Sequence, residues 1–120
     1  MVKKNSFYQP DRGDLVWLDF DPQAGTEQAG RRPAIVLSPQ NFNIATGLAI
    51  FCPITNQGKG SSFEVPLPRG AGFTGFVLTD HFRSLDWIAR SVEFHSKADK
   101  ATMWEVLGRV EAILCLDLDP

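Results

Sequence analysis

The sequence has few of the residues that bind metal ions or form disulfide networks. Its 120 residues include only two cysteines and two histidines, and neither a CxxC nor an HExxH motif occurs. Because zinc and similar metals need three or four such ligands at characteristic spacings, we expect no metal site and no cofactor. Cys52 and Cys115 each stand among apolar residues. Both are therefore predicted to be buried free thiols, which weakly favours a cytoplasmic location.

Long apolar runs are absent as well. A membrane-spanning helix needs roughly 20 apolar residues, and no run of that length occurs. The N-terminal MVKKNSFYQP has no apolar stretch after its lysines, which argues against a secretory signal. With 43% hydrophobic and 22% charged residues, the chain has the composition of one globular domain with a single core. We expect a flexible leader over 1–10, the domain over 11–116 and a short acidic tail over 117–120.

The chain also has no excess of positive charge. Its net charge is −2, which argues against broad, nonspecific binding of nucleic acids. The charges are nevertheless unevenly spread, since acidic residues crowd both ends of the chain. The basic residues of the middle are Arg31, Arg32, Lys59, Arg69, Arg83 and Arg90. A local basic site is therefore compatible with an acidic chain.

Short apolar segments broken by glycine and proline predict a chain built mainly from β-strands. The segment 21–32 is rich in glycine and polar residues, and 41–47 is expected to be a connector with about one helical turn. Pro53 suggests that its strand lies at an edge or contains a bulge. The predicted strands are 14–20, 33–39, 48–56, 63–67, 75–82 and, as a strand or a turn, 84–90.

The pattern changes towards the C-terminus, where apolar residues recur every three or four positions from 99 to 116. This spacing places them on one face of an α-helix. Ser96 and Asp99 offer a capping box, and Glu105 with Arg109 forms a favourable i, i+4 pair. The predicted fold class is therefore mainly β with a C-terminal helix, a small β-barrel that the helix closes or plugs.

Arg32 is the first candidate for a functional side chain. It stands where a glycine-rich segment enters an apolar strand, and its planar guanidinium group suits the oxygens of a phosphate. Consecutive side chains of a strand point to opposite sides, so Arg31 is not expected to face the same site. The plainer alternative is that both arginines are solvated and that one of them pairs with Glu27.

Other candidate residues have more than one interpretation. The Thr55 hydroxyl, at the end of a strand, can hold a phosphate oxygen or cap a turn. Glu27 can accept a proton, orient Arg32 or only solubilise its loop. Asp80 can cap a turn or hydrogen-bond a base, and His81 has no visible partner. The residues alone thus predict a small β-rich domain with a candidate anion site at Arg32, but no reaction.

Longer segments of the sequence carry more information. GDLVWLDFDPQAGTEQAGRRPAIVLSPQNFN, PITNQGKGSSFEVPL and GFVLTDHFRSLDWIAR follow one another in this order. Together they resemble the MazF/PemK/Kid family of toxin endoribonucleases of type II toxin–antitoxin systems, and the MazF type more closely than the Kid type. The resemblance runs from about residue 11 to residue 115.

The resemblance implies an SH3-like β-barrel of the CcdB/Kid/MazF kind that acts as a homodimer. It implies sequence-specific, metal-independent cleavage of single-stranded RNA, typically mRNA, which inhibits translation. It also implies a cognate MazE-like antitoxin whose acidic, flexible tail covers the RNA groove. A basic middle segment on an acidic chain fits either RNA or an acidic peptide.

Site residues follow from the resemblance position by position. Arg32 and Thr55 match the catalytic pair of the MazF type, and Glu27 matches an active-site glutamate. Where Kid-type enzymes have an arginine, two residues before Asp80, this chain has Leu78, so the Kid-type general acid is not carried over. The residues predicted to bind RNA are Arg31, Asn56, Gln57, Lys59, Asp80, Arg83 and Arg90.

A mechanism without a metal ion is attack of the ribose 2′-OH on the adjacent phosphate, which leaves a 2′,3′-cyclic phosphate and a 5′-hydroxyl. Loops 21–31, 56–62 and 69–74 are expected to form base pockets across a dimer interface. One alternative is a CcdB-like gyrase poison, but such proteins lack the GxEQxGxRPA and PxT motifs found here. The other is a catalytically silent barrel that binds RNA or peptides, against which the retained Glu27, Arg32 and Thr55 argue.

Overall fold

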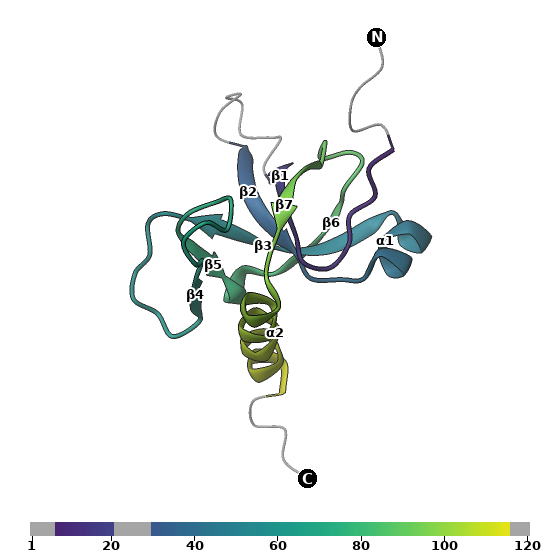
Figure 1. The fold of residues 1–120 in the computed structure, drawn as a ribbon. Coiled ribbons are helices and arrows are strands. Elements are labelled where there is room, and N and C mark those ends of the chain that lie inside the picture. Colours follow the sequence, from purple (N-terminus) through teal and green to yellow (C-terminus); the bar gives the residue numbers. More distant parts are fainter. Residues whose placement is uncertain (1–6, 21–29, 116–120) are drawn as a thin grey trace.

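The structure is a computed structural model, and it describes residues 7–20 and 30–115. Within these residues the chain forms seven strands and two α-helices (Figure 1). In chain order the elements are β1 (Asp14–Asp19), β2 (Arg31–Val36), α1 (Gln40–Thr46), β3 (Leu48–Thr55), β4 (Glu64–Pro66), β5 (Phe76–Leu78), the 3-10 turn η2 (Thr79–His81), β6 (Arg83–Asp86), β7 (Glu93–Lys97) and α2 (Lys100–Cys115). The prediction of a mainly β chain with a C-terminal helix is confirmed.

All strands belong to one antiparallel sheet in the order β4-β5-β3-β2-β1-β7. The central strand is β3, which pairs with β2 along one side and with β6 and then β5 along the other. Among the described residues no ladder joins the two outer strands, β4 and β7, so the sheet bends without closing into a complete barrel.

Pro53 shows how β3 exchanges one partner for the next. The pairing with β6 ends at Phe51, and the pairing with β5 starts at Ile54. Pro53 lies between them and is buried, so its missing N–H falls where no ladder bond is required. The prediction that this proline marks an edge strand is therefore wrong, because β3 is the central strand.

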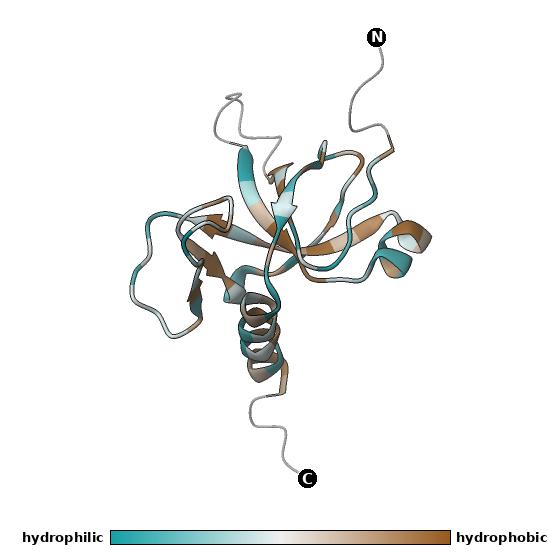
Figure 2. Ribbon diagram, viewed as in Figure 1, coloured by the Kyte–Doolittle hydropathy of each residue, from teal (hydrophilic) through white to brown (hydrophobic). Residues whose placement is uncertain are grey.

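The two faces of the sheet carry separate cores. The first core consists of Val16, Leu18, Phe20, Ala34, Val36, Ala49, Phe51, Leu85, Trp87 and Val92. The helix-side core consists of Leu15, Ile35, Leu37, Cys52, Ile54, Val65, Phe73, Val77 and Val106. Alternate residues of β1, β2 and β3 supply the two sets, as the period of two in a strand requires. Helix α2 therefore covers one face through Val106 and its neighbours (Figure 2).

Helix α2 agrees with the apolar periodicity, and its Glu105–Arg109 ion pair is present. Its N-terminal cap differs from the predicted capping box. The carboxylate of Asp99 accepts the N–H of Thr102 at 3.0 Å, whereas the Ser96 hydroxyl donates to the carbonyl of Ala71 at 3.1 Å. Asp99 is thus the cap, since strand β7 carries Ser96 away from the helix.

Several local features differ from the sequence-based expectations. Strand β7 was not predicted, because its EFHSK sequence is mostly polar and exposed. The predicted connector 41–47 overlaps the seven-residue helix α1 (Gln40–Thr46), which Gly47 ends with a φ of +74°. Both cysteines are free thiols, as predicted, but Cys115 is exposed, so the predicted burial holds only for Cys52. No helix within the described ranges is long and apolar enough to cross a membrane.

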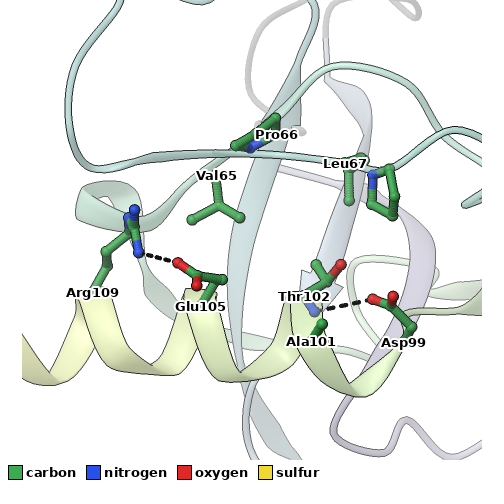
Figure 3. Close-up of a pocket in the computed structure, with 9 residues that line it drawn as sticks. Val65, Pro66, Leu67, Asp99, Ala101, Thr102, Glu105 and Arg109 are labelled. Carbon is green, nitrogen blue, oxygen red and sulfur yellow. Dashed lines mark hydrogen bonds and ion pairs between the residues drawn. The ribbon is translucent and has the colours of Figure 1, made fainter.

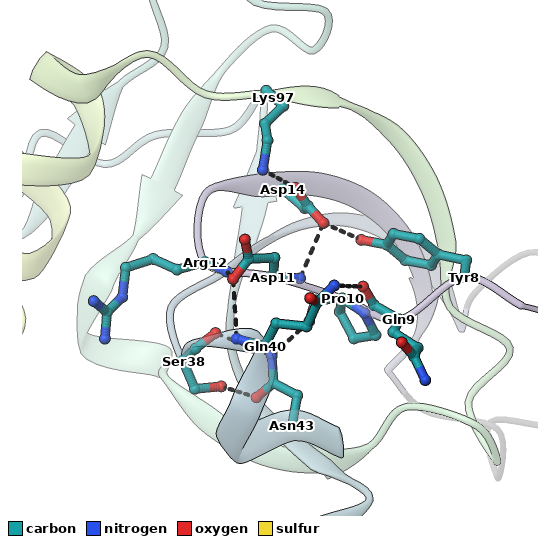
Figure 4. A network of polar contacts seen from close by, with 10 residues as sticks. All are labelled: Tyr8, Gln9, Pro10, Asp11, Arg12, Asp14, Ser38, Gln40, Asn43 and Lys97. Carbon is teal, nitrogen blue, oxygen red and sulfur yellow. Dashed lines mark hydrogen bonds and ion pairs between the residues drawn. The ribbon is translucent and has the colours of Figure 1, made fainter. Parts of the chain in front are cut away.

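The start of β1 is held by a buried polar network (Figure 4). The Asp14 carboxylate, 3% exposed, accepts hydrogen bonds from the Tyr8 hydroxyl at 2.5 Å and from the Asp11 N–H at 3.0 Å. Lys97 binds its other oxygen at 2.7 Å. Burial and the bond to Asp14 raise the pKa of Tyr8. The last residues of the predicted leader therefore pack on the domain, while 1–6 lie outside the described residues.

Candidate functional site

Arg31 and Arg32 open β2 and lie on opposite faces of the sheet because they are consecutive in a strand. Arg31 binds two carboxylates, with 3.0 Å between its Nη1 and Asp19 Oδ1 and 2.9 Å between its Nη2 and Glu93 Oε1. Burial acts to lower the pKa of Arg31, but the hydrogen bonds to Asp19 and Glu93 outweigh it and raise the pKa. The guanidinium fork of Arg31 is thus already engaged within the protein.

Arg32 lies on the same face as Ala34 and Val36 of the first core, at the exposed end of that face. Its side chain forms no hydrogen bond or ion pair with any other residue of 7–20 or 30–115, whereas its backbone lies in the β1–β2 ladder opposite Leu18. The polar start of β2 appears in teal above the brown interior of the sheet in Figure 2. A guanidinium group in this position is able to accept an anion from solvent.

Strand pairing brings the second catalytic candidate to Arg32. In the β2–β3 ladder Ala34 is paired with Pro53, and continuing the same register by two residues places Thr55 opposite Arg32. Side chains that are directly opposite in an antiparallel pair point to the same face. The ladder itself ends at the Ala34–Pro53 pair, and its continued register directs the two residues that the resemblance predicts as the catalytic pair to the same face of the sheet.

The Thr55 hydroxyl has a defined role in the turn that follows it. Its oxygen accepts the N–H of Gln57 at 3.1 Å, which leaves the hydroxyl proton to be donated elsewhere. Thr55 can therefore cap this turn and still donate its hydroxyl proton to a phosphate oxygen, so the two sequence-based interpretations do not exclude each other.

Two residues that the sequence did not single out fix the surroundings of Thr55. A Cβ on Gly75, which has a φ of +109°, would lie 2.2 Å from the carbonyl oxygen of Thr55, so only glycine fits there. The Thr74 hydroxyl donates to the Asn56 side-chain oxygen at 2.9 Å. The predicted loops 56–62 and 69–74 therefore meet beside Thr55. In the sequence, this close approach of the two loops is indicated by the glycines of PRGAGFTGF.

Arg83 and Arg90 lie near the end of β1. The guanidinium carbon of Arg83 is 5.9 Å from the centre of the Phe20 ring, a cation–π distance. The guanidinium group of Arg90 donates to the backbone carbonyls of Asp19 and Phe20, and the Phe20 N–H donates to the Gly30 carbonyl at 2.7 Å. Arg90 thus holds the end of β1, whereas Arg83 is exposed.

The remaining candidates are less closely connected to Arg32. Lys59 and Gln57 are exposed on loop 56–62. Asp80 lies in η2, where its carboxylate is 3.8 Å from His81 Nε2. Burial and, to a smaller extent, the charge of Asp80 raise the pKa of the Cys52 thiol to about 12. No hydrogen bond links Asp80 to Arg32 within the described residues, and the predicted Glu27 lies outside them.

A groove of about 610 Å³ lies between β4 and α2 (Figure 3). Its lining includes Val65, which belongs to the helix-side core, and the Glu105–Arg109 ion pair. It is therefore on the other face of the sheet from Arg32. The described residues contain no cluster of three or more histidine, cysteine, aspartate or glutamate side chains that could hold a metal ion.

Comparison with known proteins supports the same interpretation of the chain. Residues 11–114 match the family model of the PemK-like, MazF-like toxin of type II toxin–antitoxin systems. The endoribonuclease toxin MazF of Escherichia coli (strain K12) is 52% identical over 85 residues, which cover 71% of this chain and 76% of that protein. The endoribonuclease toxin ChpB of the same strain is 40% identical over 119 residues, which cover 95% and 99% of the two chains.

Solved structures show the same fold. A crystal structure of MazF (Form-I) from Deinococcus radiodurans has a TM-score of 0.82 at 51% identity, covering 91% of this chain and 99% of that one. A MazE–MazF crystal structure from the same organism has a TM-score of 0.79 at 47% identity, covering 89% and 96%. With a family match over almost the whole domain and these relatives, the chain belongs to the PemK-like, MazF-like toxins of type II toxin–antitoxin systems.

Proposed function

We propose that this protein is a sequence-specific endoribonuclease toxin that cleaves single-stranded RNA, chiefly mRNA, without a metal ion and thereby inhibits translation. The observation that carries the proposal is the register of the β2–β3 ladder, which, continued two residues beyond its last pair, places the half-buried Thr55 opposite the exposed Arg32. Relatives that are 52% and 40% identical are named endoribonuclease toxins, which supports the same reaction here.

The reaction begins with the ribose 2′-OH, whose oxygen attacks the adjacent phosphorus while a base removes its proton. The bond from phosphorus to the 5′-oxygen of the next nucleotide breaks, and that oxygen takes up a proton. The products are a 2′,3′-cyclic phosphate and a 5′-hydroxyl. Such a route needs a base, a cation for the charge that builds up on the phosphoryl oxygens, and a proton donor for the leaving oxygen.

Arg32 supplies the positive charge in this scheme. Its guanidinium group stabilises the pentacoordinate phosphate, and the Thr55 hydroxyl donates a hydrogen bond to a non-bridging oxygen. A guanidinium group acts as a cation rather than as a base, so Arg32 is not assigned the proton-accepting role. Glu27 is our candidate for the base or for the residue that orients Arg32, and it lies outside the described residues.

RNA binding is assigned to the side chains around this pair. Single-stranded RNA is selected by bases that are splayed into pockets, and we assign these pockets to loops 21–31, 56–62 and 69–74 across a homodimer. Exposed cations that suit the phosphates are Lys59 and Arg83. Arg31, Arg90 and Asp80 stay predicted RNA-binding residues, although the first two already hold partners within the protein.

A cognate antitoxin is the second partner that we propose. MazF of Deinococcus radiodurans has been crystallised with MazE, and a MazE-like protein with an acidic, flexible tail would suit the cations near Arg32. Such a tail would compete with RNA for the same surface. Because mRNA is translated in the cytoplasm, the proposal places the protein in that compartment.

The proposal is tested by incubating the purified protein with a long single-stranded RNA in EDTA and mapping the cut ends. We expect discrete cuts that disappear in Arg32→Ala and Thr55→Ala. Arg12→Ala is the matched control, since Arg12 is an exposed arginine at the opposite end of the β1–β2 pair. RNA that is bound and left intact would point to a catalytically silent barrel, and intact RNA with inhibited gyrase would point to a CcdB-like protein.

A further inference from the structure

Loop 56–62 connects β3 to β4 and follows Thr55 directly. It has no regular secondary structure, its residues are exposed, and it extends away from the sheet at the left of Figure 1. It carries the predicted RNA-binding residues Asn56, Gln57 and Lys59. An exposed loop of this kind needs specific contacts if its side chains are to keep a fixed position relative to Thr55.

The carboxylate of Glu64 supplies such contacts. Glu64 is the first residue of β4, and its Oε2 accepts the Lys59 N–H at 2.9 Å, with 3.1 Å from the same N–H to Oε1. Its Oε1 also accepts the Gly60 N–H at 3.1 Å. Consecutive backbone N–H groups form a concave anion site of the kind that binds phosphates. In this loop that site is filled by the protein's own carboxylate.

At Gly58 the loop backbone also comes close to β5, the strand that pairs with Thr55. A Cβ on Gly58 would come within 2.8 Å of the Phe76 ring and within 3.0 Å of Glu64 Oε1. Phe76 is the ladder partner of Thr55 in the β3–β5 pair. Gly58 therefore lets the backbone approach both the aromatic ring and the carboxylate, which keeps the loop close to the candidate catalytic residue.

The far end of the loop is held from α2. The Nε of Arg109 donates to the Ser62 carbonyl at 3.0 Å, and Glu105 binds Nη1 of the same guanidinium group (Figure 3). The loop is thus attached at its middle by Glu64, at its end by Arg109 and at its start by the Asn56–Thr74 hydrogen bond.

We propose that Glu64 is a positioning residue for RNA, which holds the Lys59–Gly60 backbone and thereby fixes Lys59 and Gln57 relative to Thr55. The inference rests on the proposed function and deepens it. Because both N–H groups are bound to Glu64, they do not bind the RNA phosphate, which is contacted by side chains instead. Glu64 touches none of the reacting atoms, so its loss alters substrate binding and the choice of cut sites more than the chemical step.

The test compares wild-type protein with Glu64→Ala, Glu64→Gln and a matched control. Asp11→Ala is the control, because the Asp11 carboxylate likewise accepts two backbone N–H groups, from Arg12 at 2.8 Å and Gln40 at 2.9 Å. Asp11 lies just before β1 in the polar network of Figure 4, whereas Arg32 pairs with Leu18 near the other end of that strand. Cut sites are mapped on a long RNA, KM and kcat are measured on a short RNA with one mapped site, and amide hydrogen exchange is followed at Lys59 and Gly60.

We expect Glu64→Ala to raise KM about tenfold, with kcat changed by less than about threefold, since two hydrogen bonds to a charged acceptor are lost. It should also cut at additional sites and exchange its Lys59 and Gly60 amides faster. Glu64→Gln keeps one acceptor oxygen and should lie between wild type and Glu64→Ala. If Glu64→Ala does not fold, the KM and the cut sites of Glu64→Gln test the positioning role instead. Asp11→Ala should keep the wild-type KM and cut sites.

Two results would overturn the inference, and one of them would overturn the proposed function as well. If wild-type protein cuts RNA and the Glu64 variants keep its KM and cut sites while their amides exchange faster, the positioning role is wrong and the proposed function stands. If wild-type protein leaves RNA intact, the proposed function fails and the positioning role fails with it.

Discussion

At one end of the β1–β2 pair Asp14 is buried among Tyr8, Asp11 and Lys97, whereas at the other end Arg32 is exposed without a partner among the described residues. The first end satisfies its polar groups internally, and within the described residues no buried side-chain nitrogen or oxygen lacks a hydrogen bond. The second end leaves the exposed Arg32 cation beside a half-buried hydroxyl, that of Thr55, whose proton is not donated to any described residue. Folding explains the first arrangement and leaves the second without a structural purpose, which favours a role in binding.

The two consecutive arginines at the start of β2 show the same contrast. Arg31 joins Asp19 of β1 to Glu93 of β7, so it links three neighbouring strands. Arg32 has no such task. The difference predicts that substitutions at the Asp14 end change stability without changing chemistry, and that substitution of Arg32 itself does the reverse.

The largest effect is expected for Arg32→Ala. Removing the cation that faces the reacting phosphate should lower kcat about 100-fold to 1,000-fold. Since the side chain is exposed, the free energy of unfolding should change by less than about 0.5 kcal/mol. Single-turnover cleavage and urea unfolding measure the two quantities. Equal losses of activity in Arg31→Ala and Arg32→Ala would remove the contrast between the two arginines.

Asp14→Ala should have the next largest effect, on stability. It leaves the Tyr8 hydroxyl and the Asp11 N–H without their acceptor, so the free energy of unfolding should fall by about 3 kcal/mol. The activity of each folded molecule should not change. Urea unfolding, with active-site titration of the folded fraction, checks this. Lys97→Ala is the milder control, because Lys97 is 58% exposed and should cost about 0.5 kcal/mol.

Thr55→Val should lower kcat at least about tenfold, since it removes one hydrogen bond from a hydroxyl to the charged phosphate while keeping the side-chain shape. Thr55→Ser retains the hydroxyl and should stay close to wild type. A rate series of the three proteins on one RNA gives the comparison. If valine is as active as threonine, the hydroxyl serves only the turn with Gln57.

The smallest effect is expected at Asp99, which belongs to neither end of the β1–β2 pair. Hydrogen bonds from the Thr102 side chain and backbone lower the pKa of Asp99. A lowered pKa means that Asp99 contributes stability above its unfolded value of about 3.9, and that this is lost as the pH falls through the folded value. Thermal unfolding from pH 7 to pH 3 should show a loss in wild type that Asp99→Asn lacks. An identical pH profile for both proteins would contradict this.

Local patterns in the sequence were sufficient for some elements and insufficient for others. The apolar period of α2 and the apolar segments of β1, β2 and β3 are local signals, and each was found. Strand β7 was missed because an exposed edge strand such as EFHSK has little apolar alternation. The edge prediction from Pro53 failed because β3 changes partner at that residue, and pairing over long sequence distances is not encoded in a local pattern.

The candidate site divides in the same way. Arg32 could be singled out from its own surroundings, as a cation before an apolar strand. Its proximity to Thr55 depends on the β2–β3 register, and only the whole-chain resemblance paired the two residues beforehand. The bonds from Glu64 to the Lys59 and Gly60 backbone depend on how loop 56–62 folds back, so nothing in the sequence alone indicated them.

The most direct test of the central claim uses two RNA oligonucleotides that contain the mapped cut site. One has ribose throughout, and the other has a single 2′-deoxyribose at the nucleotide 5′ to the cut. With EDTA present, we predict that the first is cleaved to a 2′,3′-cyclic phosphate and a 5′-hydroxyl, and that the second is bound but stays intact. Cleavage of the deoxyribose-containing oligonucleotide at the same position would contradict the account.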